Sequence, residues 1–189
     1  MGFNFCKTSI DGLILIEPHI SIDDRGYFIK EFEKNVFSKN NLPTTFVENN
    51  ESKSKKGTLR GIHFQTNHSQ GKLIRVIKGA VYDVAVDLRY NSPTFGKWEG
   101  FELSDINHIE LYIPPFFGHG FLALENDTIF SYKCTDEYCP EYDSGIKYDD
   151  SDIAIDWQFD KLDCEMIISD KDRQLQSFIE FKGKKIFSY

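Results

Sequence analysis

Three short clusters in this chain carry side chains that can hold or move a proton. The first places His63 in a strand-like run beside a glycine and an aromatic residue (LRGIHFQ). The second places His119 between two glycines after a Pro-Pro turn, and the third contains Tyr132. An imidazole titrates near neutral pH and a phenol can donate its proton, so these residue types can supply a base and an acid. The two histidines can also ligate a metal ion.

Each cluster also has a purely structural interpretation. A histidine in a strand is often a buried residue with satisfied hydrogen bonds, and a tyrosine that faces the interior often packs there with a partner for its hydroxyl. Asp172 ends a stretch, residues 169–172, that is typical of a helix N-cap, so it can simply help to cap the last helix. Two histidines fall short of the three ligands that a metal site usually needs, and we expect no metal.

Short runs of alternating apolar residues, separated by turn residues, fill the chain from residue 45 to residue 135. They predict strands at 45–51, 58–65, 72–78, 80–88, 97–103, 109–113, 120–124 and 128–135. Gly79 joins two of these runs as a tight hairpin, and alternation places Asp83 and Asp87 on one face of the second run. Eight strands of this length predict an all-β jelly roll or small barrel. Helices are expected only near 34–40 and after Ser169.

The composition is that of one folded domain spanning residues 1–189. Hydrophobic residues make up 40% of the chain and charged residues 28%, which argues against global disorder. The net charge of −8 argues against a nonspecific nucleic-acid binder. No segment approaches the roughly 20 apolar residues of a membrane span. Four scattered cysteines and an N-terminus without a signal-like apolar stretch predict a cytoplasmic protein.

Several motifs occur in the order known from one enzyme family. They lie at 24–28 (DRGYF), 57–65, 70–87, 92–96 (SPTFG), 103–104, 113–122 and 132–138 (YKCTDEY). On these motifs the chain resembles the dTDP-4-dehydrorhamnose 3,5-epimerase family over nearly its whole length. The resemblance implies a cupin-type jelly-roll barrel with short peripheral helices. It also implies an isomerase without metal or cofactor that acts on a nucleotide-diphospho-4-keto sugar, and a homodimer whose subunits exchange N-terminal strands.

The resemblance assigns roles to four catalytic residues. A 4-keto group acidifies the C–H bonds at C3 and C5, because the resulting carbanion delocalises onto the ketone oxygen as an enolate. His63 is implied as the base, with Asp172 orienting its ring and stabilising its protonated form. Tyr132 is implied as the acid on the opposite face of the sugar, and Lys72 as the cation beside the enolate oxygen.

The resemblance implies that arginines bind the diphosphate, because a guanidinium can donate hydrogen bonds to two phosphate oxygens at once. The matching positions are Arg25 and Arg60. Strict alternation points Arg60 and His63 to opposite faces of a strand, so both reach one substrate only if Gly61 forms a bulge or the substrate wraps an edge, for instance at a subunit boundary. Further substrate contacts are implied for Lys30, Glu48, Asn50, Asp83, Tyr138, Asp143 and His119, the last to the sugar or a phosphate.

The nucleotide-base end departs from the family pattern. Glu48 stands where the family usually has Gln, Lys30 where it has Glu, and Asp143 where it has a Glu near the sugar. Asn50 is retained, while Glu51 replaces a frequent His. A carboxylate can accept the adjacent N1–H and N2–H2 donors of guanine as a pair, whereas thymine offers one ring N–H. We therefore hypothesise a GDP-linked 4-keto sugar, with a heptose of capsule or surface polysaccharide synthesis as the sugar. The alternative substrate is dTDP-4-keto-6-deoxyglucose, with neutral drift at the altered positions.

Two readings from other functional classes remain. A non-catalytic cupin would bind a nucleotide sugar, but it would need neither an acid nor a base. A metal-dependent cupin isomerase or dioxygenase would hold a transition metal, usually through a His-x-His pair followed by Glu, whereas Phe64 and Gln65 follow His63. The enzyme without a metal is the favoured interpretation.

Overall fold

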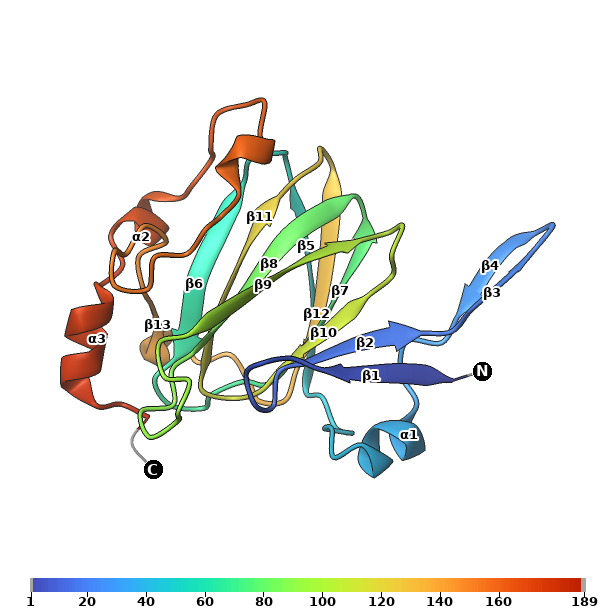
Figure 1. The fold of residues 1–189 in the computed structure, drawn as a ribbon, viewed down its shortest axis with the longest axis horizontal. Helices are drawn as coiled ribbons and strands as arrows, with labels where there is room; N and C mark the ends of the chain where they lie inside the picture. Colours follow the sequence, from blue (N-terminus) through green and yellow to red (C-terminus); the bar gives the residue numbers. More distant parts are fainter. Residues whose placement is uncertain (1, 188–189) are drawn as a thin grey trace.

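Two antiparallel sheets enclose the core in the computed structural model, which describes residues 2–187 (Figure 1). The six-stranded sheet has the order β1 (Phe3–Lys7), β2 (Ile14–Pro18), β10 (Glu110–Ile113), β7 (Lys72–Lys78), β12 (Thr128–Cys134), β5 (Glu48–Ser54). The five-stranded sheet has the order β13 (Asp143–Gly145), β6 (Leu59–Gln65), β11 (Phe117–Ala123), β8 (Ala80–Asp87), β9 (Trp98–Ser104). The prediction of an all-β fold with short peripheral helices is confirmed.

The remaining elements lie at the periphery. A two-stranded hairpin of β3 (Ile20–Asp23) and β4 (Gly26–Ile29) projects away from the sheets (Figure 1). The helices are short: α1 (Lys34–Lys39), α2 (Asp170–Arg173), α3 (Phe178–Lys184) and the 3-10 turns η1 (Pro140–Tyr142) and η2 (Phe159–Lys161). Within residues 2–187 no helix is long and apolar enough to cross a membrane.

The main core lies between the two sheets. Val81 and Ala85 of β8 share one cluster with Ile74 of β7 and Phe130 of β12, and all four side chains are inaccessible to solvent. The other face of β8 packs in a second cluster that includes Phe181 of α3. Each such buried side chain contributes about 1.5–3 kcal/mol to folding, so β8 is fixed from both faces.

The strand predictions agree with the structure between residues 45 and 135, but strands outside that region were missed. All eight are present, with ends that move by a few residues, and the helices near 34–40 and after residue 169 are confirmed. Five strands were not predicted: β1, β2, β3, β4 and β13. Strands β1, β3 and β4 are half-buried or exposed along their length, and β13 has three residues, so their apolar alternation is too weak to indicate a strand.

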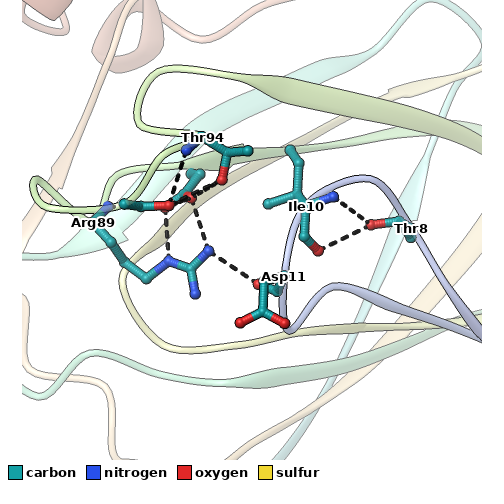
Figure 2. A network of polar contacts seen from close by, with 7 residues as sticks. Thr8, Ile10, Asp11, Arg89 and Thr94 are labelled. Atoms are coloured by element: carbon teal, nitrogen blue, oxygen red, sulfur yellow. Dashed lines mark hydrogen bonds and ion pairs between the residues drawn. The ribbon is translucent and has the colours of Figure 1, made fainter.

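A polar network holds the end of β8 to the loop between β1 and β2 (Figure 2). The Asp87 carboxylate is fully buried and accepts bonds of 2.8 Å from Nε and Nη2 of Arg89. The hydroxyls of Ser92 and Thr94 each donate to Asp87 Oδ2 over 2.6 Å. Arg89 also donates to the backbone carbonyl of Asp11 over 3.0 Å. This network fixes the turn after β8 and ties it to the loop between β1 and β2.

Candidate active site

A cavity of about 570 Å³ opens between the two sheets. Its walls come from β5, β7 and β12 of one sheet and from β6, β11 and β13 of the other. Seven of the thirteen predicted site residues line it: Glu48, Asn50, His63, Lys72, Tyr132, Tyr138 and Asp143. Residues that are far apart in the sequence thus meet in one site.

His63 and Asp172 form a hydrogen-bonded pair on one wall. His63 Nε2 lies 2.7 Å from Asp172 Oδ1, and the imidazole is a third exposed to the cavity while the carboxylate is buried. Burial would raise the pKa of Asp172, but the hydrogen bond and charge of His63, with the backbone N–H of Gly61, lower it below its ordinary value. Asp172 is therefore an anion that holds Nε2–H, which leaves Nδ1 to accept a proton.

The helix around Asp172 is capped by a different residue. Ser169 Oγ accepts from the backbone N–H of Asp172 over 3.1 Å, as expected for an N-cap. Because the cap uses only the backbone of Asp172, its carboxylate is turned to His63. The interpretation of Asp172 as a helix cap alone is therefore wrong.

A bulge in β6 brings Arg60 and His63 to one face. His63 pairs with His119 on β11, but Arg60 pairs with Phe121, so three steps on β6 match two on β11. Gly61 has φ of +112°, and a Cβ there would lie 2.5 Å from the Cα of Gly120, so only glycine fits. The predicted bulge at Gly61, which lets Arg60 and His63 share one face, is confirmed. Arg60 is close enough to oppose the rise in the pKa of Tyr132 through its charge.

Tyr132 and Lys72 lie on the opposite wall, in the six-stranded sheet. Burial raises the pKa of Tyr132, and the neighbouring Cys134 and Glu48 raise it further, so the phenol keeps its proton. Burial lowers the pKa of Lys72, and the charges of Cys134 and Asp83 oppose this. The cavity therefore has a potential base on one wall and a protonated phenol with an amine on the other.

His119 and Asp83 form a second pair on β11 and β8, and His119 is the cross-strand neighbour of His63. His119 Nε2 lies 2.9 Å from Asp83 Oδ2, and both residues are buried. Burial lowers the pKa of His119, and Asp83 opposes this while Lys72 and His63 add to it. His119 was expected to contact the sugar or a phosphate, but it is not among the residues that line the cavity. The pair adjoins the wall that carries His63, and the contacts of His119 and Asp83 with substrate stay predictions.

The structure does not bring Arg25 and Lys30 to the cavity of their own chain. The hairpin of β3 and β4 projects from the sheets (Figure 1). Arg25 lies in its turn, 90% exposed, with an ion pair of 2.6 Å to Asp23. Lys30 pairs with Glu33 over 2.7 Å. Their contacts with substrate therefore stay predictions.

Several cavity residues were missed from the sequence, among them Gln65 and Lys171. Gln65 Nε2 donates to the carbonyls of His68 and Glu137, and its Oε1 accepts from the N–H of Cys139. It therefore ties together two loops at the mouth of the cavity. Lys171 forms an ion pair with Asp143 at the same mouth. Its position next to Asp172 was the one signal that could have indicated it, whereas the partners of Gln65 carry no local signal.

Comparisons with known proteins agree with this geometry. The family model described as dTDP-4-dehydrorhamnose 3,5-epimerase matches residues 7–180. The chain is 56% identical over 171 residues to the enzyme of that name from Methanothermobacter thermautotrophicus, covering 90% of this chain and 92% of the relative. It is 43% identical over 187 residues to that of Escherichia coli (strain K12), covering 98% and 100% of the two chains.

A solved structure shows the same fold. The dTDP-6-deoxy-D-glucose-3,5-epimerase of Legionella pneumophila, in complex with dTDP-4-keto-L-rhamnose, superimposes with a TM-score of 0.93 at 41% identity, covering 100% of this chain and 99% of that one. The two-sheet barrel is thus the cupin fold of these isomerases, as predicted. On the family match, the sequence identity and the shared fold, the chain belongs to the dTDP-4-dehydrorhamnose 3,5-epimerase family.

Proposed function

We propose that this protein is a dTDP-4-dehydrorhamnose 3,5-epimerase, which inverts C3 and C5 of a dTDP-linked 4-keto-6-deoxy sugar. The observation that carries the proposal is the placement of His63, paired with Asp172, and of Tyr132 on opposite walls of one cavity. Inversion at carbon needs a base on one face of the ring and an acid on the other. A protein that only binds the sugar would need neither.

The proposed reaction begins with proton removal. His63 Nδ1 takes the proton from the carbon next to the ketone, and the C–H electrons move onto the ketone oxygen as an enolate. Asp172 stabilises the imidazolium that forms. Lys72, on the other wall, offers its ammonium to the developing oxyanion, and such a charge acts more strongly in a desolvated site than in water.

Reprotonation completes the inversion. Tyr132 gives its phenolic proton to the opposite face of the same carbon, and the enolate electrons return to form the new C–H bond. The raised pKa of Tyr132 supports this role, because the phenol remains protonated until the carbanion takes its proton. His63 then releases its proton to water and the Tyr132 phenolate takes a proton from water, which restores both groups. The same steps at the second carbon next to the ketone give the double epimer.

The nucleotide is proposed to be dTDP. The relatives carry dTDP in their names, and the Legionella structure holds dTDP-4-keto-L-rhamnose. The comparisons give no support to the GDP-linked heptose that the base-end residues suggested. The structure also weakens the reason for that hypothesis, because Glu48 already accepts from the N–H of Tyr138 over 2.6 Å and from Asn50 Nδ2 over 3.2 Å. Glu48 would have to give up these bonds to accept a pair from guanine.

We also propose that the chain acts as a single domain and as a homodimer. The projecting hairpin exposes Ile22, Tyr27 and Phe28, which are 80%, 56% and 55% accessible. Burying them on a second copy would remove an apolar surface from water and carry Arg25 toward another cavity.

Exchange with solvent deuterium tests the proposed function. The protein is incubated in D2O with dTDP-4-keto-6-deoxyglucose or with the GDP form of the same sugar, and deuterium at C3 and C5 is followed by NMR. We expect incorporation at both carbons with the dTDP sugar and much slower incorporation with the GDP form. Binding without exchange would support the non-catalytic alternative, and equal rates would remove the nucleotide preference.

A further inference from the structure

One exposed tyrosine at the mouth of the cavity is held both at its backbone and at its hydroxyl. Tyr138 is 51% exposed, yet its backbone N–H donates to Glu48 Oε1 over 2.6 Å and its hydroxyl donates to Asp143 Oδ2 over 3.0 Å. An exposed tyrosine without such bonds is free to sample several rotamers. Two bonds at opposite ends of the residue fix the ring in one position on the rim.

Glu48 is committed to this task by both of its oxygens. Oε1 accepts from Tyr138 and Oε2 from Asn50, which lies two residues further along the same strand, β5. Strand β5 is the edge of the six-stranded sheet, paired with β12, so the carboxylate has a rigid base. It reaches across to a residue that is 90 positions away in the sequence.

Asp143 holds the other end of Tyr138 and is itself held. The oxygen that accepts the tyrosine hydroxyl also receives the ammonium of Lys171, and the Asp143 side chain is 14% exposed. Lys171 directly precedes Asp172, the partner of His63. Four links therefore connect the ring to the proposed base: the Tyr138–Asp143 hydrogen bond, the Asp143–Lys171 ion pair, one peptide unit and the Asp172–His63 hydrogen bond.

We infer that Glu48 and Asp143 form a latch that fixes Tyr138 at the mouth of the cavity and thereby sets the affinity for the nucleotide end of the substrate. The affinity part of this inference rests on the proposed function. A base can stack on a tyrosine ring, and a ring that is already ordered loses less freedom when this happens. Both carboxylates are positioning residues that act through Tyr138. Glu48 thus differs from a group that reads the base itself.

Matched variants separate the latch from a base-reading role. Glu48→Ala removes the acceptor of the Tyr138 N–H, Glu48→Gln keeps a carbonyl oxygen in its place, and Tyr138→Phe keeps the ring but removes its bond to Asp143. Glu137→Ala is the control, because it removes an exposed carboxylate one residue from Tyr138. The readouts are amide hydrogen exchange of residue 138 in the free protein, the Kd for dTDP and for GDP by calorimetry, and KM and kcat.

We expect Glu48→Ala to speed the exchange of the Tyr138 amide. It should also raise KM and the Kd for dTDP by up to about tenfold, the cost of ordering one freed side chain when the nucleotide binds. The kcat should stay within about twofold, since the reacting carbons lie elsewhere. Glu48→Gln should restore most of the affinity, Tyr138→Phe should weaken binding by a few fold, and Glu137→Ala should change nothing. In a Tyr138→Ala background, Glu48→Ala should add little, because its effect passes through the ring.

Three results would overturn the inference, in whole or in part. An unchanged amide exchange rate in Glu48→Ala would show that there is no latch, whatever the activity. Faster exchange with an unchanged Kd would remove the link to affinity. A reversed preference between dTDP and GDP in Glu48→Gln would make Glu48 a base reader instead. If the wild-type protein shows neither epimerisation nor dTDP binding while the amide behaves as expected, the proposed function and the link to affinity fail together, and the latch stands.

Discussion

Two buried carboxylates on one strand have opposite surroundings. Asp83 and Asp87 lie four residues apart on the inward face of β8, and both are fully buried. Asp87 accepts from the guanidinium and backbone of Arg89 and from the hydroxyls of Ser92 and Thr94 (Figure 2). Asp83 accepts one bond, from His119, and its Oδ1 has no hydrogen-bond partner among residues 2–187.

This difference separates a structural carboxylate from one that serves a site. Burial would raise the pKa of Asp87, but the hydrogen bonds from Arg89, Ser92 and Thr94 lower it, so its charge is fully compensated. Such a group stabilises the fold and has no capacity left for chemistry. A buried carboxylate oxygen without a partner costs stability, and here it lies next to His119, the cross-strand neighbour of the proposed base. Hydrogen-bond saturation thus distinguishes two residues that the sequence pattern treats alike.

The largest effect should come from His63, which lies next to His119, the partner of Asp83. His63→Ala removes the proposed base, and we expect kcat to fall by about a thousandfold, within the range for general base catalysis. The free energy of unfolding should also fall by about 1–3 kcal/mol, because the buried carboxylate of Asp172 loses its partner. Deuterium exchange and urea unfolding measure the two quantities. A variant that retains full activity would end the proposed mechanism.

The opposite pattern is expected at Asp87. Asp87→Ala leaves Arg89 and two hydroxyls without their acceptor, and the free energy of unfolding should fall by about 3 kcal/mol, as for other broken buried ion pairs. The kcat of the folded fraction should stay near the wild-type value. Urea unfolding gives the first number and assays well below the melting temperature give the second. A loss of kcat without loss of stability would contradict the assignment of Asp87 as purely structural.

The stabilisation by Asp87 should also depend on pH in a defined direction. Its pKa is lower in the folded protein than in the unfolded chain, where an aspartate titrates near about 3.9. The stabilisation is therefore complete above that value and disappears as pH falls through the lower, folded pKa. We expect the difference in unfolding free energy between wild type and Asp87→Ala to be constant from pH 5 to 7 and to shrink below about pH 4. A difference that grows in acid would have the wrong sign.

The sequence predicted this molecule best where the information is local. Alternation placed Asp83 and Asp87 on one face of β8, and Gly61 indicated the bulge that aligns Arg60 with His63. Residue types and the family resemblance placed His63 and Tyr132 in one site. The bond between Glu48 and Tyr138 spans 90 residues, so no local pattern indicated it, and the carboxylate was interpreted as a reader of guanine.

The position of Arg25 lay beyond the sequence for a different reason. Arg25 is 90% exposed on the projecting hairpin and is not among the residues that line the cavity, so its contact with substrate stays a prediction that the proposed homodimer would explain. A motif can name such a residue, but the pattern of one chain cannot show which cavity it reaches. The strands of the hairpin were missed for the same reason, because apolar residues that are exposed in one chain do not follow the alternation of a buried face.

The smallest predicted effect tests the comparison most directly, because the same substitution is made at both carboxylates. Burial lowers the pKa of Lys72, and the charges of Cys134 and Asp83 oppose that effect. Asp83→Asn keeps an acceptor for His119 but removes a negative charge near the ammonium, so the pKa of Lys72 should fall further. The alkaline limb of the kcat profile should then move to lower pH, with a loss below about tenfold at pH 7. Asp87→Asn should leave that limb in place and lower stability instead, since Asp87 does not contribute to the pKa of Lys72. Identical pH profiles for the two variants would mean that the charge of Asp83 does not reach the site, and that hydrogen-bond saturation does not distinguish the two carboxylates.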